Sequence, residues 1–307
     1  MVIYVTTHQA MTNSEISLRL TFLGTGTSIG VPAIGCGCEV CHSTLSEDKR
    51  LRTSALIESN SGLRVLIDCG PDFRQQILTQ PFRKIDAVLL THIHYDHVAG
   101  LDDLRPFCIY GDVDIYAQYD VIEGLHTIMP YCFKAGHLYP GVPHLRLHEA
   151  VAGKTILISR PDSIVAKFPA SGANLDGRLN TVGVTEIVPA VTEKLEVVPI
   201  PVLHGALPIL GYRIGRLAYI TDMKSPLETT LPLLQGVDTL VINALRFEKA
   251  HHSHQLVDDA IKFSRLVGAR KTFLIHVTHD IGTHDMANQR LPEGFYFAYD
   301  GLTIEID

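Results

Sequence analysis

The sequence predicts a mixed α/β protein, and three observations support this class. Several runs of four to seven residues are alternating or wholly apolar, which is typical of strands. The segment 255–267 instead repeats its apolar residues at helical spacing. Metal-type residues follow several predicted strands, which suggests that those strands end at one shared edge. With 307 residues and 46% hydrophobic residues, the chain can build a large core.

The first half of the chain predicts strands separated by short helices. Strands are predicted over residues 17–23, 54–59, 63–68, 86–90 and 113–117. The second and third of these flank Asn60-Ser61-Gly62 and therefore form a predicted hairpin. Helices are predicted over 72–80 and 119–129. Residues 1–16 are expected to form an N-terminal tail before a single domain over 17–307.

The second half begins with a segment near 134–194 that is rich in turns. We expect it to be an elaborated insertion within the same domain, with short β-like runs. Strands follow over 194–204, 237–245 and 271–276, and hairpins over 211–222 and 295–306. The last hairpin is predicted from its Asp-Gly turn, and the helix lies over 255–267.

Composition and charge exclude several classes of function. The net charge of −7 argues against non-specific binding to nucleic acid, which requires clustered Lys and Arg. No run of about 18 apolar residues occurs, so no membrane span is expected. Three of the six cysteines lie within six residues, too close together for an ordinary disulfide framework, and we expect a reducing, cytoplasmic location.

The stretch THIHYDH, residues 91–97, predicts a metal site. In an extended loop His92 and His94 project to the same side, so that two imidazoles can bind one ion. Asp96 and His97 follow and can bind a second ion nearby. Histidine and aspartate suit Zn²⁺ and also Mn²⁺. The alternative is a polar loop with chance histidines, in a chain that has 16 of them.

Further donors follow distant strands. These residues are Asp68, His204, Asp222 and His276. A pair of ions needs about seven or eight donors, and HxHxDH with later strand-end ligands supplies them. Two ions would lower the pKa of a shared water and stabilise an oxyanion, so this arrangement indicates a hydrolase.

A second site is predicted in the cysteine-rich stretch GCGCEVCHS. Cys38 and Cys41 have the spacing of a zinc knuckle, and Cys36 adds a third thiolate. A closed structural zinc site needs a fourth ligand from elsewhere in the chain. The alternative is a reduced loop with free thiols.

HxHxDH followed by His204, Asp222 and His276 resembles the metallo-β-lactamase superfamily. The resemblance implies a four-layer αββα sandwich with its active site at one edge of the two sheets. It implies that His92, His94 and His204 hold one catalytic metal, that Asp96, His97 and His276 hold the other, and that Asp222 bridges them. It also implies that Asp68 orients ligands without binding metal.

The stretch GTGTSIGVPAIGCGCEVC resembles the start of the PhnP-type phosphodiesterases, which hydrolyse a phosphoribosyl cyclic phosphate. In that family a structural zinc takes three cysteines of this loop and a histidine three residues after the last catalytic ligand. The resemblance therefore implies a structural zinc on Cys36, Cys38, Cys41 and His279. It also implies a substrate-binding histidine before the helix that precedes the last metal strand, and His254 matches that position.

We therefore expect a metal-dependent phosphodiesterase with two divalent metals, zinc or manganese, and one structural zinc. Asp96 and His254 are the expected catalytic residues, with a protonated His254 near the substrate phosphate, although His254 could instead be a surface or capping residue. The alternatives are an RNase Z-like tRNA 3′ endonuclease, a lactonase or thioesterase, and a non-catalytic PqqB-like accessory protein. The expected partner is a small phosphodiester, without nucleic acid or membrane, and symmetry alone makes a homodimer the default.

Overall fold

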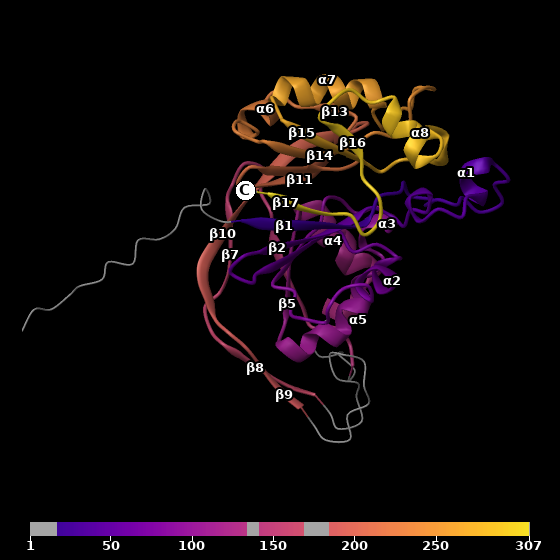
Figure 1. Cartoon of the computed structure of the whole chain (residues 1–307). Coiled ribbons are helices and arrows are strands. Elements are labelled where there is room, and N and C mark those ends of the chain that lie inside the picture. Colours follow the sequence, from indigo (N-terminus) through magenta and orange to yellow (C-terminus); the bar gives the residue numbers. More distant parts are fainter. Residues whose placement is uncertain (1–16, 134–140, 169–183, 307) are drawn as a thin grey trace, which may run out of the picture.

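The computed structural model describes residues 17–133, 141–168 and 184–306 (Figure 1). The tail predicted for 1–16 lies outside these residues. Two large β-sheets face each other, and helices cover the outer face of each sheet, as Figure 1 shows. This arrangement confirms the predicted four-layer αββα sandwich.

The first sheet has seven strands, and four neighbours in it run parallel. In spatial order the strands are β17 (Thr303–Ile306), β1 (Leu18–Gly24), β2 (Ser54–Ser59), β3 (Arg64–Ile67), β4 (Ala87–Leu89), β5 (Val113–Ala117) and β6 (Leu145–Glu149). β2 and β3 are antiparallel neighbours, which confirms the hairpin predicted around Gly62. β3, β4, β5 and β6 are parallel, so their carboxyl ends lie at one edge.

The second sheet combines antiparallel and parallel strands. In spatial order these are β13 (Ser225–Pro226), β10 (Val191–His204), β11 (Leu207–Ile214), β12 (Leu217–Ile220), β14 (Thr239–Asn243), β15 (Lys271–Ile275) and β16 (Phe295–Phe297). The eighth strand, β7 (Ile156–Arg160), pairs with the first part of β10. The hairpin predicted over 211–222 is present as β11 and β12, although β11 begins earlier.

Helices lie on the outer faces of both sheets. Those on the side of the first sheet are α2 (Phe73–Ile77), α3 (Tyr95–Val98), α4 (Tyr119–Ile128), α5 (Pro130–Phe133) and a 3₁₀ helix over Leu101–Tyr110. Those on the second sheet are α6 (Thr230–Leu233), α7 (Val257–Val267) and α8 (His284–Gln289). The predicted helices over 72–80, 119–129 and 255–267 thus correspond to α2, α4 and α7.

In the central strands, buried side chains alternate between two cores. In β3, Val65 and Ile67 belong to the core between the sheets, whereas Leu66 packs against the helices of the first sheet. A wholly buried apolar strand therefore contributes to two interfaces at once. Burial of each such side chain stabilises the fold by about 1.5–3 kcal/mol, so the parallel strands form a rigid support for the loops at their ends.

The hairpin predicted over 295–306 is wrong. β16 pairs in parallel with β15 in the second sheet, whereas β17 pairs with β1 in the first. The Asp300-Gly301 turn therefore carries the chain from one sheet to the other, and Gly301 N–H donates to the carbonyl of Phe22 at 2.8 Å. Alternating residues around an Asp-Gly turn are compatible with either arrangement, because the pattern does not specify the partner strand.

Two described strands of the segment 134–194 extend the two main sheets, and two others form a sheet of their own. β6 extends the first sheet and β7 the second. A separate two-stranded sheet is formed by β8 (Ile164–Phe168) and β9 (Val184–Val188), which project away from the sandwich in Figure 1.

Among the residues that the structure describes, none of the helices combines the length and the apolar character needed to cross a membrane.

Candidate metal centre

The seven predicted catalytic ligands meet at one edge of the sandwich. His204 is the last residue of β10, His276 directly follows β15, and Asp222 comes two residues after β12. The other four, His92, His94, Asp96 and His97, lie in the loop after β4 and in the first turns of α3. Both sheets thus contribute donors, which agrees with a site at their shared edge.

The backbone is left-handed at three of the strand ends. Asp68, Asp222 and His276 have φ values of 58°, 57° and 55°. Non-glycine residues rarely adopt this conformation, and it costs of order 1–3 kcal/mol for each residue. These left-handed residues come one or two positions after a buried strand, where the chain leaves the sheet and the side chains meet at the site.

The first ligand set consists of His92, His94 and His204. Their ligand nitrogens lie within 4.8 Å of one another. The ring centroid of His94 is 4.5 Å from that of His92 and 5.1 Å from that of His204. His92 and His204 are buried, while His94 is exposed, so this set opens to solvent on the His94 side.

The second ligand set consists of Asp96, His97 and His276, with ligand atoms again within 4.8 Å of one another. Asp222 lies between the sets. Its Oδ1 is 3.1 Å from His276 Nε2, its Oδ2 is 3.3 Å from His97 Nε2, and it also forms a compact group with His92 and His97. A carboxylate in this position could bridge two ions.

Asp68 does not join either set and instead holds the ligands in place. Its Oδ2 is 2.7 Å from His97 Nδ1, which leaves Nε2 of that ring facing Asp96 and Asp222. The Thr91 hydroxyl donates to Asp68 Oδ2 at 2.9 Å and lies 3.0 Å from His92 Nδ1. Asp68 therefore orients His97 directly and His92 through Thr91.

Backbone carbonyls orient the third buried histidine. His204 Nδ1 lies 2.8 Å from the carbonyl oxygen of Asp222 and 2.9 Å from that of Ser253. Because both partners can only accept, Nδ1 carries the proton and Nε2 is available as a ligand. The Thr221 hydroxyl donates to Asp222 Oδ2 at 2.6 Å. The sequence did not predict a role for Thr91, Thr221 or Ser253. The one sequence feature that could have identified them is that each directly precedes a predicted ligand or His254.

Unpartnered nitrogens provide a test of whether a metal fits here. His92 Nε2, His97 Nε2 and His276 Nε2 are buried and have no hydrogen-bond partner among the described residues. A buried polar atom without a partner costs about 1–3 kcal/mol. Three imidazole nitrogens beside two carboxylates form a donor set that Zn²⁺ and Mn²⁺ accept. The residues therefore fit a pair of divalent ions.

Electrostatics keep the carboxylates of the site ionised. Burial alone would raise the pKa of Asp222, but His276 and His97 hold it far below its usual value. Burial also opposes the low pKa of Asp96, which the adjacent His276 and His97 rings maintain. The pKa of His92 is lowered by burial and by the neighbouring His97, so its imidazole is neutral, as a metal ligand must be.

His254 lies inside the site, in the loop before α7. Its ring stacks on His276 with centroids 4.8 Å apart, and its Nδ1 is 3.6 Å from Asp222 Oδ1. That nitrogen is buried and has no hydrogen-bond partner among the described residues. Burial, with the nearby His276, lowers the pKa of His254 to about 3. The imidazolium form expected from the sequence is therefore disfavoured, and the ring is neutral near neutral pH.

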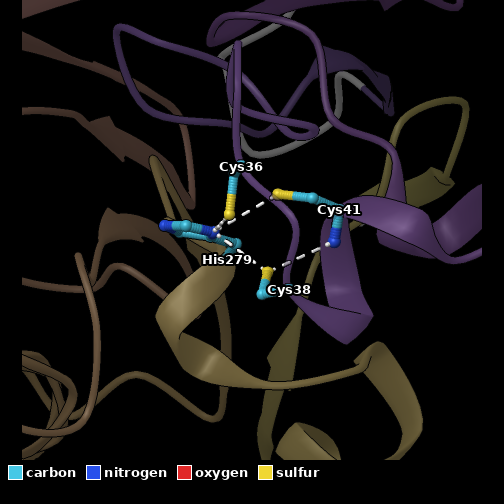
Figure 2. Close-up of side chains that lie close together, drawn as sticks. All are labelled: Cys36, Cys38, Cys41 and His279. Carbon is cyan, nitrogen blue, oxygen red and sulfur yellow. Dashed lines mark hydrogen bonds between the residues drawn. The ribbon is translucent and has the colours of Figure 1, made fainter.

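The predicted structural site is also assembled. The sulfur atoms of Cys36, Cys38 and Cys41 each lie 3.2 Å from His279 Nδ1, as Figure 2 shows. One ring nitrogen cannot satisfy three thiols by hydrogen bonding. Tetrahedral zinc, with Zn–S of about 2.3 Å and Zn–N of about 2.0–2.1 Å, would separate sulfur and nitrogen by about 3.5 Å. The four side chains therefore fit a closed zinc site.

Backbone groups favour thiolate at this cluster. The N–H of Cys41 donates to the sulfur of Cys38 at 3.5 Å and lowers the pKa of that thiol to about 6. Burial raises the pKa of Cys41 to about 11, against the hydrogen bond that it accepts from Ala33 N–H at 3.3 Å. At least one thiolate is thus present near neutral pH, as zinc ligation requires.

The two sites are joined through the backbone after β15. His279 comes three residues after His276, in a short 3₁₀ helix over His279–Ile281. Between them, the carbonyl of Val277 accepts a hydrogen bond from Thr27 N–H at 3.1 Å, and Val277 forms a bridge to Gly26. The cysteine loop, which carries α1 (Glu39–His42) and projects from the sandwich in Figure 1, is thereby attached to the edge that bears the catalytic ligands.

Comparisons with known proteins agree with this geometry. A model of the β-lactamase superfamily domain matches residues 63–277. A solved structure described as a new diphosphatase from the PhnP family is 34% identical, with a TM-score of 0.76, and the match covers 95% of this chain and 98% of that one. Zinc-bound PqqB from Methylobacterium extorquens is 20% identical with a TM-score of 0.61 over 93% and 99% of the two chains, which shows the fold alone.

Two curated relatives match the chain over only part of their own length, and the first is named for acyl transfer. The octanoyltransferase of Porphyromonas gingivalis is 39% identical over 290 residues, which are 94% of this chain but 52% of the relative. Coenzyme PQQ synthesis protein B of Rhodopseudomonas palustris is 36% identical over 115 residues, 33% of this chain and 37% of that protein. The chain therefore spans about half the length of the first relative and a smaller share of the second.

Proposed function

The chain belongs to the metallo-β-lactamase superfamily, close to its PhnP family, and we propose that it is a metal-dependent phosphodiesterase. The observation that supports this most directly is the position of Asp222 between two sets of three ligands. Such an arrangement suits hydrolysis of a phosphate ester, in which charge spreads over several oxygens. The substrate would be a small phosphodiester, either cyclic or containing a diphosphate.

The chain would hold the ions with residues that are already oriented. His92, His94 and His204 would bind one ion, and Asp96, His97 and His276 the other, with Asp222 between them. When bound, two divalent ions supply Lewis acidity toward the phosphoryl oxygens and a water of lowered pKa. The contribution of Asp68 is to fix the tautomer and direction of His97, so that little rearrangement is needed when the ions bind.

His254 would contact the substrate itself. Its ring lies against His204 and His276, with centroids 4.6 and 4.8 Å away, so it faces the position between the two ligand sets. A neutral imidazole can donate one N–H to a phosphoryl or leaving-group oxygen and accept at its other nitrogen. His254 is thus the group of this chain best placed to bind the phosphate and to stabilise the departing oxygen by a hydrogen bond, while Asp96 serves as ligand and as an acceptor beside it.

The cysteine cluster would hold zinc for structural reasons. Its four donors leave no open ligand position, as is typical of structural zinc. Because the cluster includes His279, it would fix the loop after the last catalytic ligand. Loss of this zinc would therefore loosen the catalytic edge without removing a catalytic donor.

The proposal is tested by activity on bis(p-nitrophenyl) phosphate with protein stripped of metal and reloaded separately with Zn²⁺ or Mn²⁺. Cyclic phosphodiesters and diphosphate-containing diesters should then be compared as substrates. Metal-dependent turnover is expected. Absence of turnover on all three substrate types, with two catalytic ions bound per chain, would refute the phosphodiesterase assignment while leaving the metal centre intact.

An acyl hydrolase is the second candidate, and the relative named octanoyltransferase is the observation that favours it. Because this chain spans 52% of that relative, the named activity can reside in the other half. The same ligand sets could act on a thioester or lactone. Hydrolysis of an octanoyl thioester without any turnover of phosphodiesters would favour this candidate.

An RNase Z-like nuclease and a non-catalytic PqqB-like role are less well supported. The net charge of −7 disfavours binding of a long nucleic acid. A human short-form tRNase Z has a TM-score of 0.60 but 18% identity, so it shares the fold alone. The full set of oriented donors also argues for an enzyme. Cleavage of a tRNA precursor, or absence of all hydrolytic activity, would support these alternatives.

A further inference from the structure

A basic cavity lies at the opposite end of the first sheet from the metal centre. It is about 190 Å³ in volume, and its cationic lining residues are Arg64, Arg83, Lys84 and Arg160. Arg64 is the first residue of β3, whereas Asp68 follows the last residue of that strand. At about 3.3 Å per residue the two are roughly 13 Å apart along the strand. The cavity is therefore separate from the catalytic edge.

Arg64 is the most deeply buried of these cations, with 1% of its surface exposed. Its Nη1 donates to the carbonyl of Arg83 at 2.8 Å, and its Nε lies 3.1 Å from Glu58 Oε1. Its Nη2 has no hydrogen-bond partner among the described residues. That nitrogen is also closed to water, so Arg64 contributes positive charge behind the cavity wall without a donor that opens into the cavity.

Lys84 adds a second charge without a close partner. It is half-buried, and no ion pair within 4.0 Å is found for it among the residues in the described ranges. Burial lowers its pKa, against the attraction of the more distant Asp86 and Asp114. A half-buried ammonium is stabilised when an anion occupies the space beside it.

The remaining two arginines shape the cavity and are already paired. Arg160 donates from Nη1 to both oxygens of Asp86, from Nε to the carbonyl of Pro189 and from Nη2 to that of Gly62. Arg83 is paired with Glu58, which it shares with Arg64. These contacts join the beginning of β3 to β7 and to the chain just after β9, so the walls are fixed by groups other than Lys84.

The charges around the cavity do not balance. The four cations face three carboxylates, which are Glu58, Asp86 and Glu186. Glu186 also accepts a hydrogen bond from the Tyr110 hydroxyl at 2.9 Å. One positive charge therefore remains, and Lys84 is the lining cation for which no ion pair is found among the described residues.

We propose that this cavity binds a small tetrahedral oxyanion of the phosphate class, held by Lys84 and attracted by the buried charge of Arg64 behind the cavity wall. The volume is below the 300–1,000 Å³ of sites for drug-sized ligands, so it suits a single phosphate group and excludes a nucleotide. A lysine donor in a confined space of positive charge forms a strong charge-assisted hydrogen bond with such an anion. The site is independent of the proposed catalytic activity and would persist if that proposal failed.

Crystals of the metal-loaded protein soaked in sodium tungstate test the proposal directly. Tungstate is a tetrahedral oxyanion with a strong anomalous signal. A peak within hydrogen-bonding distance of Lys84 Nζ is expected, in addition to any peak at the metal centre. No peak in the cavity at a tungstate concentration that fills the metal centre would overturn the proposal.

Calorimetric titration with inorganic phosphate at constant ionic strength tests it in solution. Lys84→Met should weaken binding at this site by about tenfold or more, since a charge-assisted hydrogen bond is lost. Lys262→Met, on the exposed face of α7, is the matched control and should bind as the wild type does. Equal phosphate affinity in the wild type and Lys84→Met, with both proteins folded by circular dichroism, would overturn the proposal.

Discussion

His97 Nδ1 and Asp68 Oδ2 lie 2.7 Å apart, and both side chains are completely buried. Burial opposes a high pKa for His97, but Asp68 and Asp222 raise it well above its usual value. The carboxylate thus fixes a proton on Nδ1, and a bound metal would replace the second proton on Nε2, which faces the site. A residue outside both ligand sets would thereby decide how one ligand is presented.

Asp68→Asn should weaken metal binding while the protein remains folded. The amide retains the size of the carboxylate but not its charge, so His97 is held less firmly. We expect the affinity of the second ligand set to fall by about 10- to 100-fold, as is typical for partners of metal-bound histidines. Competition with a fluorescent chelator measures this affinity. Asp103→Asn, an exposed carboxylate after the metal loop, is the control; equal affinities in both variants would contradict this role.

Cys38→Ser should remove one zinc per chain and leave the catalytic pair in place. A hydroxyl is a poor substitute for a thiolate in a site of three cysteines and one histidine. Elemental analysis of purified protein would then find one ion fewer than in the wild type, together with a lower melting temperature. Cys108→Ser is the matched control, because Cys108 lies outside the cluster. Unchanged zinc content in Cys38→Ser would show that the cluster does not hold metal.

Lys224 should act as a positioning residue for His254. Its ammonium donates to the carbonyl of His251 at 2.8 Å and to that of His254 at 3.1 Å. Lys224→Met removes both bonds, and we expect kcat/KM on the phosphodiester substrate to fall about tenfold or more.

A double-mutant cycle distinguishes positioning from a general loss of stability. In a His254→Ala background, Lys224→Met should have little further effect on kcat/KM, because the group that it positions is gone. Hydrogen exchange of amides 251–255 should rise in Lys224→Met regardless of activity. Fully additive losses in the cycle, with unchanged exchange, would rule out the positioning role.

Asp300 should make stability depend on pH. Burial raises its pKa to about 6, although Leu51 N–H and the Thr25 hydroxyl donate to it at 2.6 and 2.8 Å. The folded state therefore binds the proton more tightly than the unfolded state. This stabilisation, about 3 kcal/mol at most, is fully present below the unfolded pKa of about 4 and is lost as pH rises through 6.

Urea unfolding between pH 4 and 7 measures that effect. The free energy of unfolding of the wild type should fall relative to that of Asp300→Asn as pH rises across this range. Glu228→Gln, at an exposed position, should run parallel to the wild type. Parallel curves for Asp300→Asn as well would mean that Asp300 does not titrate in this window.

The ligands could be predicted from the sequence because their pattern is local. HxHxDH is contiguous, and His204 and His276 stand where apolar strands stop. Thr91 could not be predicted as an orienting residue, because a threonine before a histidine has no distinctive spacing. The left-handed backbone at Asp68 and Asp222 was equally hidden, since only the packed strand ends impose it.

The fold was predictable to the level of elements and layers but not of every pairing. β3 and β14 are wholly buried apolar runs, which local patterns identify well. The partners of β16 and β17 depend on which sheet offers a free edge, a property of the assembled fold. The clustering of Arg64, Lys84 and Arg160 is likewise a long-range contact that no local pattern encodes.

The most direct test of the account is a count of catalytic metals beside phosphodiesterase activity in the wild type and in Asp222→Ala. The account predicts two catalytic ions per chain and metal-dependent turnover of bis(p-nitrophenyl) phosphate in the wild type. In Asp222→Ala, turnover should be lost together with at least one catalytic ion, while the zinc of the cysteine cluster remains. Wild-type turnover and full metal content in Asp222→Ala would contradict the central claim that this carboxylate joins the two ligand sets.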